Sequence, residues 1–281
     1  MTHSYTQEQI NSLFSLWETG EYTRRQLAYK LNMSLSFVYR SIQKAGYKLP
    51  TMSDSTRKYS VEDNFFNTID TEEKAYFLGL LYSDGSNIEK RNIIQLTLQK
   101  KDLHILKRLT SLIQPDKPIY ETKDKKYCSI AIYSLQMSQD LIKLGCVSKK
   151  SLILKFPNSE QIPDHLMNHF IRGIFDGDGS IMVSQEKYKF TFSVCGTEDI
   201  VSNIRDRLIG ECNVNKVTTG TKIIPSTQNI LYSICYNGRV NCLKIKNYLY
   251  KDATVYLNRK YDKFFSVPLI GRKKNGRKKE V

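Results

Sequence analysis

The first fifty residues alternate polar capping residues with short amphipathic runs, and this pattern predicts three short helices. Thr6 followed by Gln9 is a capping-box pattern. It opens a run whose apolar residues recur at helical spacing, namely Ile10, Leu13, Phe14 and Trp17. Thr23 with Gln26 repeats the signal ahead of a second run, and Ser34 is placed to cap a third. A small all-helical unit is therefore expected at this end of the chain.

A second pattern, further along the chain, occurs twice. Residues 75–86 read AYFLGLLYSDGS and residues 169–180 read HFIRGIFDGDGS, so equivalent positions lie 94 residues apart. Each copy is followed by two strand-like segments, an acid-capped helix, two further strands and a last helix. The pattern predicts an α+β fold built from two αββαββα repeats, 71–157 and 158–266.

Two polar segments flank these repeats. Residues 51–70 show no sustained periodicity and are expected to form a linker. Residues 267–281 form a basic tail, which from Gly271 onward reads GRKKNGRKKEV, with six basic residues among eleven. A solvated tail with general affinity for nucleic acid is its expected behaviour.

Charge indicates the kind of partner. The chain carries 43 Lys and Arg against 28 Asp and Glu, a formal net charge of +15, which suggests a polyanion. The first 70 residues hold 8 basic and 7 acidic groups, so 35 and 21 remain for the rest. Nucleic acid is favoured over a membrane surface, because the sequence has neither a lipidation motif nor a basic amphipathic helix. No small-molecule substrate is indicated.

Apolar runs, the N-terminal segment, the cysteines and the histidines give no sign of a membrane span, a signal peptide or a zinc site. No apolar run approaches the roughly 20 residues that cross a bilayer, and MTHSYTQEQI lacks a signal-peptide core, so an intracellular protein is expected. The six cysteines form no CxxC pair and are expected to be small buried side chains. His165 and His169 could share a helical face, but no third ligand lies nearby, so a zinc site is not expected.

The N-terminal helices suggest a DNA contact. The segment GEYTRRQLAYKLNMSLSFVYRSIQKAGYK resembles the helix-turn-helix of resolvases and transposases, and residues 22–50 contain six basic residues and no acid. A helix-turn-helix DNA-binding domain over 1–50 is the interpretation, with its third helix in a major groove. The candidate contacts are Arg24, Arg25, Ser36, Tyr39, Arg40, Gln43 and Lys44. A three-helix bundle without a DNA role is the alternative.

The repeated motif resembles that of a known enzyme family. Residues 77–85, FLGLLYSDG, and 171–179, IRGIFDGDG, are similar to the paired motifs of the LAGLIDADG homing endonucleases, and the resemblance covers roughly 70–266. The flanking stretches LGCVSKKSLILKFP and YLYKDATVYLNRKYDKF are similar to phage- and intron-borne members. A single Asp-Gly is an ordinary turn or helix end, whereas two copies in register are specific.

Physical chemistry gives this motif a meaning. Gly79 and Gly173 lack side chains, which lets two helices pack almost backbone to backbone. Each helix then ends at an acid, Asp84 or Asp178, on the unfavourable end of the helix dipole. Two carboxylates brought together repel each other, and divalent cations reverse both costs. Mg²⁺ prefers such oxygen ligands and keeps waters that can act as nucleophiles.

The resemblance assigns metal binding to the acid before the last glycine of each motif, hence to Asp84 and Asp178. Asp176, which stands where the first copy has Tyr82, does not inherit that role, and a part in charge balance stays open. Lys150 and Lys260 are candidates to polarise water or stabilise the leaving oxygen, by their position relative to the last helix of each repeat. General phosphate contact is the alternative for both lysines.

The interpretation is a site-specific double-strand DNA endonuclease that works as a pseudo-symmetric monomer. The resemblance implies that the sheets form a saddle over the duplex, that intron homing is its context, and that cleavage leaves short 3′ overhangs. The added helical unit predicts a long target site. Two alternatives remain, a non-cleaving transcriptional regulator on the same scaffold and an RNA-splicing maturase.

Overall fold

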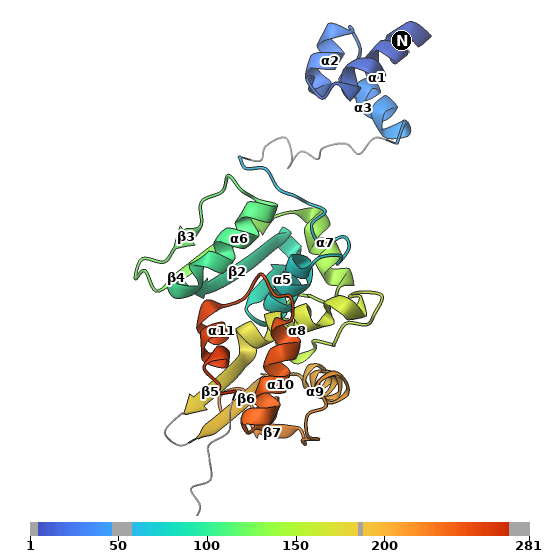
Figure 1. The fold of residues 1–281 in the computed structure, drawn as a ribbon. Helices are drawn as coiled ribbons and strands as arrows, with labels where there is room; N and C mark the ends of the chain where they lie inside the picture. Colours follow the sequence, from blue (N-terminus) through green and yellow to red (C-terminus); the bar gives the residue numbers. More distant parts are fainter. Residues whose placement is uncertain (1–4, 47–57, 185–187, 270–281) are drawn as a thin grey trace, which may run out of the picture. The chain divides into compact units, whose positions relative to one another are not determined.

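The computed structural model describes residues 5–46, 58–184 and 188–269. The chain divides into two compact units, Met1–Lys58 and Tyr59–Val281, whose helices and strands are drawn in Figure 1. Each unit has an apolar core of its own. Among the described residues, no helix has the length and apolarity needed to cross a membrane.

Residues 5–46, the described part of the first unit, form α1 (Gln7–Glu18), α2 (Arg24–Lys30) and α3 (Leu35–Lys44). Thr6 and Thr23 form the two predicted capping boxes, and the Ser34 side chain accepts a hydrogen bond from the Phe37 amide at the start of α3. The buried core of this unit consists of Leu13, Leu27, Ala28, Met33, Val38 and Ile42. The three predicted helices are confirmed, whereas their DNA role stays a prediction.

The second unit contains the predicted repeat twice. The elements of the first copy are α5 (Glu72–Ser83), β1 (Gly85–Ile88), β2 (Ile93–Gln99), α6 (Leu103–Ile113), β3 (Tyr120–Glu121), β4 (Tyr127–Tyr133) and α7 (Leu135–Lys143). Those of the second are α8 (Met167–Asp178), β5 (Gly179–Ser184), β6 (Lys189–Gly196), α9 (Glu198–Cys212), β7 (Gly220–Ile223), β8 (Ile230–Asn237) and α10 (Arg239–Tyr250). The α+β class and the αββαββα order are thus confirmed.

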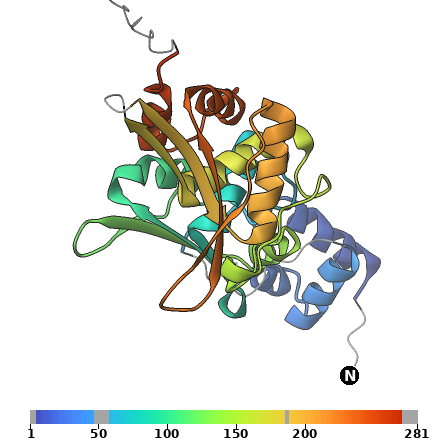
Figure 2. The same cartoon turned by 90° about the horizontal axis from the view of Figure 1, so that it is seen from below.

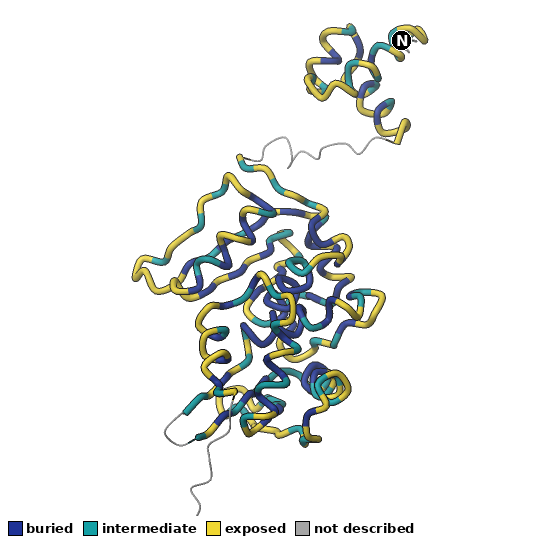
Figure 3. Tube along the Cα trace, viewed as in Figure 1, coloured by how far each residue is buried: buried dark blue, intermediate teal, exposed yellow. Residues whose placement is uncertain are grey.

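Each repeat has one four-stranded antiparallel sheet, in the orders β1-β2-β4-β3 and β5-β6-β8-β7. Residues alternate along β2, with Ile94, Leu96 and Leu98 buried and the residues between them exposed. Because successive strand residues point to opposite faces, one face of β2 lies against the core and the other exposes Gln95, Thr97 and Gln99. The distribution of burial along the chain is drawn in Figure 3.

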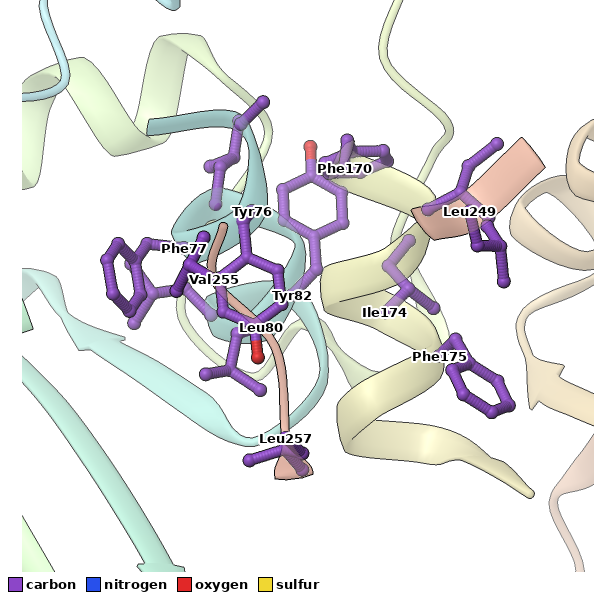
Figure 4. Packing of buried hydrophobic residues seen from close by; sticks show 14 of the residues in the cluster. Tyr76, Phe77, Leu80, Tyr82, Phe170, Ile174, Phe175, Leu249, Val255 and Leu257 are labelled. Atoms are coloured by element: carbon purple, nitrogen blue, oxygen red, sulfur yellow. The ribbon is translucent and has the colours of Figure 1, made fainter. Parts of the chain in front are cut away.

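Helices α5 and α8 lie side by side at the centre of this unit (Figure 2). A Cβ atom added at Gly79 would lie 2.1 Å from the Phe170 carbonyl oxygen, and one added at Gly173 would lie 2.1 Å from that of Tyr76. Each glycine therefore faces the backbone of the other helix. Figure 4 shows apolar side chains of both helices around this contact, including Leu80 and Ile174.

Two predicted boundaries are wrong. Phe65, Phe66 and Ile69 lie within the expected linker 51–70 yet are buried in the core of the second unit. Their segment has no regular secondary structure, so its apolar residues follow no period. Val267, assigned to the tail, is 2% exposed and packs on the same core. Residues 270–281, which make up the rest of the expected tail, lie outside the described residues.

One helix was not predicted as a separate element. The chain continues beyond α10 into α11 (Asn258–Phe265), which carries Lys260. The first repeat ends differently, because Lys150 begins a short 3-10 turn, η3 (Lys150–Leu152). The two candidate lysines are therefore presented by different local structures.

Candidate metal centre

The two motif aspartates are at the C-terminal ends of the two packed helices. Asp84 is the C-cap of α5, and Asp178 is the last residue of α8. Gly177, next to Asp178, faces the end of α5, because a Cβ atom added there would lie 1.9 Å from Ser83 Oγ and 3.3 Å from Asp84 Oδ2. The close approach at the glycines thus continues to the helix ends and brings the two acids together.

The electrostatics of this pair are unfavourable to negative charge. Burial raises the pKa of Asp84, and it raises the pKa of Asp178 to about 6 with a further contribution from the charge of Asp84. Both residues are exposed to solvent on one side, so solvent moderates these effects. Their place at helix C-termini adds a small unfavourable dipole interaction. A divalent cation between them would reverse the sign of these interactions.

Both candidate lysines reach this centre and contact equivalent atoms. Lys150 Nζ donates to the Gly85 carbonyl at 2.5 Å, and Lys260 Nζ donates to the Gly179 carbonyl at 2.6 Å. These glycines directly follow the two aspartates. Lys150 and Lys260 are only 7% and 6% exposed, and the charge of each opposes the rise in the pKa of both acids. The structure therefore brings the four central candidates into one site.

The two lysines differ in how firmly they are held. Lys260 Nζ also donates to the carbonyls of Phe175 and Asp176, at 2.5 and 2.7 Å. These are C-terminal carbonyl groups of α8, which attract a cation. Burial lowers the pKa of Lys260 to about 8, while neighbouring carboxylates, chiefly Asp176, oppose that shift.

The donor set fits a hydrated magnesium ion. Among the described residues, no group of three or more His, Cys, Asp and Glu side chains is placed to hold a metal, so this centre offers two carboxylates. Mg²⁺ is commonly held by one or two carboxylates, with waters and substrate phosphates completing its octahedral shell. Asp84 and Asp178 would hold such an ion, which would be expected to activate a water and neutralise charge on a phosphate.

One ion pair beside the centre was missed by sequence reasoning. Arg259 Nε donates to both carboxylate oxygens of Asp102, at 3.2 and 3.0 Å, and Asp102 is 2% exposed. Arg259 opposes the rise in the pKa of Asp84, whereas Asp102 adds to it. The two residues are 157 positions apart in the sequence. The one sequence feature that could have pointed to Arg259 is its position directly before Lys260.

The N-terminal candidates gather on one side of their own unit. A surface pocket there is lined by Arg24, Arg25, Ser36, Tyr39 and Arg40, together with Thr23 and Leu35. The Arg24 guanidinium lies 5.6 Å from the centre of the Tyr39 ring. Gln43 and Lys44 are exposed on the last turn of α3. Five of the seven residues thus line one surface of α2 and α3.

No family model matches the chain, and no curated protein matches it. Among solved structures it is similar to the LAGLIDADG homing endonuclease I-SmaMI bound to cleaved DNA, with a TM-score of 0.45 and 14% identity over 70% of this chain and 88% of that one. It is also similar to the meganuclease I-AabMI bound to uncleaved DNA, with a TM-score of 0.45 and 14% identity over 68% and 88%.

Proposed function

We propose that this protein is a site-specific, metal-dependent double-strand DNA endonuclease of the LAGLIDADG type. The observation that carries this proposal is the meeting of Asp84 and Asp178 at packed helix ends, each with a lysine beside it. A site that concentrates two acids and two buried cations suits a phosphodiester, whose hydrolysis needs metal ligands and positive charge around the phosphate.

The chain's own residues would divide the reaction between them. Asp84 and Asp178 would hold Mg²⁺, which would supply charge neutralisation and an activated water for the cutting of both strands. Lys150 and Lys260 stabilise charge on the scissile phosphates or orient a water, one on each side of the centre. Two repeats in one chain supply two such halves, which matches the two strands of a duplex and a monomeric enzyme.

The surface suits the same substrate. The outward face of β2 carries the polar side chains Gln95, Thr97 and Gln99, which can contact base edges and phosphates. The net charge of +15 provides attraction to the backbone. The N-terminal helices would lengthen the contacted site through α3. We therefore expect a long DNA target with homing as the context.

The decisive experiment is cleavage. The purified chain, incubated with Mg²⁺ and DNA from the neighbourhood of its own gene, should produce breaks at a defined site. Asp84→Asn and Asp178→Asn should abolish cutting and preserve site binding, because each loses a metal ligand. Asp206→Asn, an exposed acid on α9, is the matched control and should cut normally. Binding without cutting by the wild type would favour a regulator, and cutting by the double variant would exclude these ligands.

The lysines give a second prediction. Lys150→Met and Lys260→Met should each slow one strand much more than the other, because each lysine lies on its own side of the centre. A positioned general acid or base contributes about 10²–10⁴-fold. Single-turnover cleavage of a supercoiled plasmid should therefore accumulate nicked circles, with opposite strands cut by the two variants. Equal slowing of both strands would reduce the lysines to general phosphate contacts.

A further inference from the structure

A buried polar cluster joins the two central helices to the segment between α10 and α11. Arg172, on α8, is fully buried and donates to the carbonyls of Leu249 and Val255, at 2.7 and 3.0 Å. It also forms an ion pair with Glu72 on α5, at 2.6 Å. We call residues 254–257 the crossing segment, because it passes beside both helices (Figure 4).

The crossing segment is fixed at both ends by carboxylates. Glu72 accepts hydrogen bonds from the amides of Thr254 and Val255, at 2.7 and 3.0 Å. At the other end, Asp176 Oδ2 accepts from the Leu257 amide at 2.8 Å. Leu257 directly precedes α11, so the second carboxylate sets where that helix begins.

Asp176 is connected to the metal centre through α11. Lys260 is three residues beyond Leu257 and donates back to the Asp176 carbonyl at 2.7 Å. The Asp176 carboxylate also accepts from the Tyr76 hydroxyl at 2.8 Å. The first turn of α11 is therefore held at one end by the Asp176 side chain and at the other by main-chain groups of α8.

The burial of the Asp176 carboxylate is unfavourable to the stability of the fold, which indicates a role other than packing. Its side chain is fully buried, and Oδ1 has no hydrogen-bond partner among the described residues. A buried carboxylate left partly unpaired destabilises a fold compared with an apolar residue of similar volume. What this carboxylate provides is a fixed position for the Leu257 amide.

We propose that Asp176 is a positioning residue, which holds Lys260 at the metal centre by fixing the start of α11. This inference rests on the proposed endonuclease function. It goes beyond that function because it predicts that cleavage of the two DNA strands depends on different positioning residues. In this proposal Asp176 is not a metal ligand. Its carbonyl accepts directly from Lys260 Nζ, and its carboxylate fixes the start of α11 through the Leu257 amide.

The first repeat supplies the matched control. The position equivalent to Asp176, 94 residues earlier, is Tyr82, whose hydroxyl donates to the Leu144 carbonyl. The segment before Lys150 is held by a different carboxylate, because Glu89 Oε1 accepts from the Ser148 amide at 2.6 Å. Lys150 itself donates to the Gly85 carbonyl. Tyr82→Phe therefore removes a buried hydrogen bond at the equivalent place in the other repeat.

The test compares strand cleavage in single-turnover plasmid assays. Asp176→Ala leaves the Leu257 amide without its acceptor and should slow the strand that Lys260→Met slows, roughly 10- to 100-fold, since small misplacements of catalytic groups have effects of this order. Asp176→Asn keeps an acceptor and should restore most of that rate. Tyr82→Phe should leave this strand unchanged. If Asp176→Ala does not fold, Asp176→Ser, whose side chain is one bond shorter than the carboxylate, replaces it.

A second readout needs neither metal nor DNA. Amide hydrogen exchange should become faster in residues 257–265 of Asp176→Ala and stay unchanged in α7, with Asp176→Asn again intermediate. Unchanged exchange in α11 would overturn the positioning role, whatever the cleavage result. Equal slowing of both strands, or Asn behaving like Ala, would also overturn it. Absence of cleavage by the wild type, with faster exchange in α11, would reject the endonuclease proposal and leave the structural link standing.

Discussion

At the scale of single residues, Asp84 and Asp178 lie in surroundings that do not favour their ionised carboxylates. The burial that raises the pKa of each acid, and the charge of Asp84 that raises that of Asp178 to about 6, disfavour the ionised form in the folded chain. Ordinary aspartates titrate near 4. The folded, metal-free protein therefore holds a proton at Asp178 more tightly than the unfolded chain does.

This shift predicts a pH-dependent stability. Between about pH 4 and pH 6 the folded state binds more protons at Asp178 than the unfolded state, so the free energy of unfolding should fall as the pH rises through this window. Asp178→Asn should show a smaller fall, although Asp176, whose pKa burial also raises to about 6, contributes in both proteins. Thermal melting in a chelator, at pH values from 4 to 7, measures the difference.

The same reasoning predicts a response to metal. At pH 7, Mg²⁺ should raise the melting temperature of the wild type and leave Asp178→Asn almost unaffected, because the ion stabilises the paired carboxylates. The effect should be at most about 1 kcal/mol after allowance for solvent exposure, or about 2–4 °C for a domain of this size. Asp206→Asn should respond as the wild type does, and an equal response by Asp178→Asn would argue against ligation by that residue.

At the scale of elements, the α5–α8 contact is what makes the site. Any side chain at Gly79 or Gly173 would collide with a carbonyl group of the facing helix, 2.1 Å from its Cβ. Backbone cannot yield as a flexible side chain can, so the helices would have to separate. Since both acids are at the ends of these helices, the separation would also widen the proposed metal centre.

Glycine substitutions test this contact. Gly79→Ala or Gly173→Ala should destabilise the fold by about 1–3 kcal/mol or more, as overpacked cores do, and should weaken Mg²⁺-dependent cutting. Gly210→Ala in α9 is the control, because nothing lies within 4 Å of an added Cβ, and alanine there should stabilise the helix by up to about 1 kcal/mol. Denaturant unfolding of the three variants makes the comparison, and a neutral Gly79→Ala would contradict the contact.

At the scale of the whole molecule, two units with separate cores share one chain. Residues 22–50 contribute six basic residues without an acid, and five of the predicted contacts line one surface of the first unit. The second unit holds the proposed catalytic centre. Binding and cutting should therefore be separable in this protein.

Removal of residues 1–58 should weaken DNA binding and shorten the footprint, while cutting persists at high protein concentration. The salt dependence should also flatten, because each lost phosphate contact reduces its slope by about 0.9. A chain lacking only residues 270–281 is the control, and it should change the slope without shortening the footprint. An unchanged footprint after removal of 1–58 would make the first unit a passive bundle.

The sequence alone determined the features that are encoded within a few consecutive residues. Capping pairs such as Thr6 with Gln9 decide helix starts locally, and strand alternation is visible residue by residue. The 94-residue repeat fixed the α+β order, and the motif glycines and aspartates indicated a helix seam with acids at its end. Lys150 and Lys260 were also predicted as candidate site residues, from their positions relative to the last helix of each repeat.

Tertiary structure decided what depends on partners far apart in the sequence. Phe65 and Phe66 have no period that could reveal their burial, because an irregular segment exposes no regular face. Arg259 meets Asp102 across 157 positions, and Asp176 meets the Leu257 amide across 81. A local pattern specifies an element through nearby hydrogen bonds and periodicity, whereas these contacts exist only after the two repeats have packed.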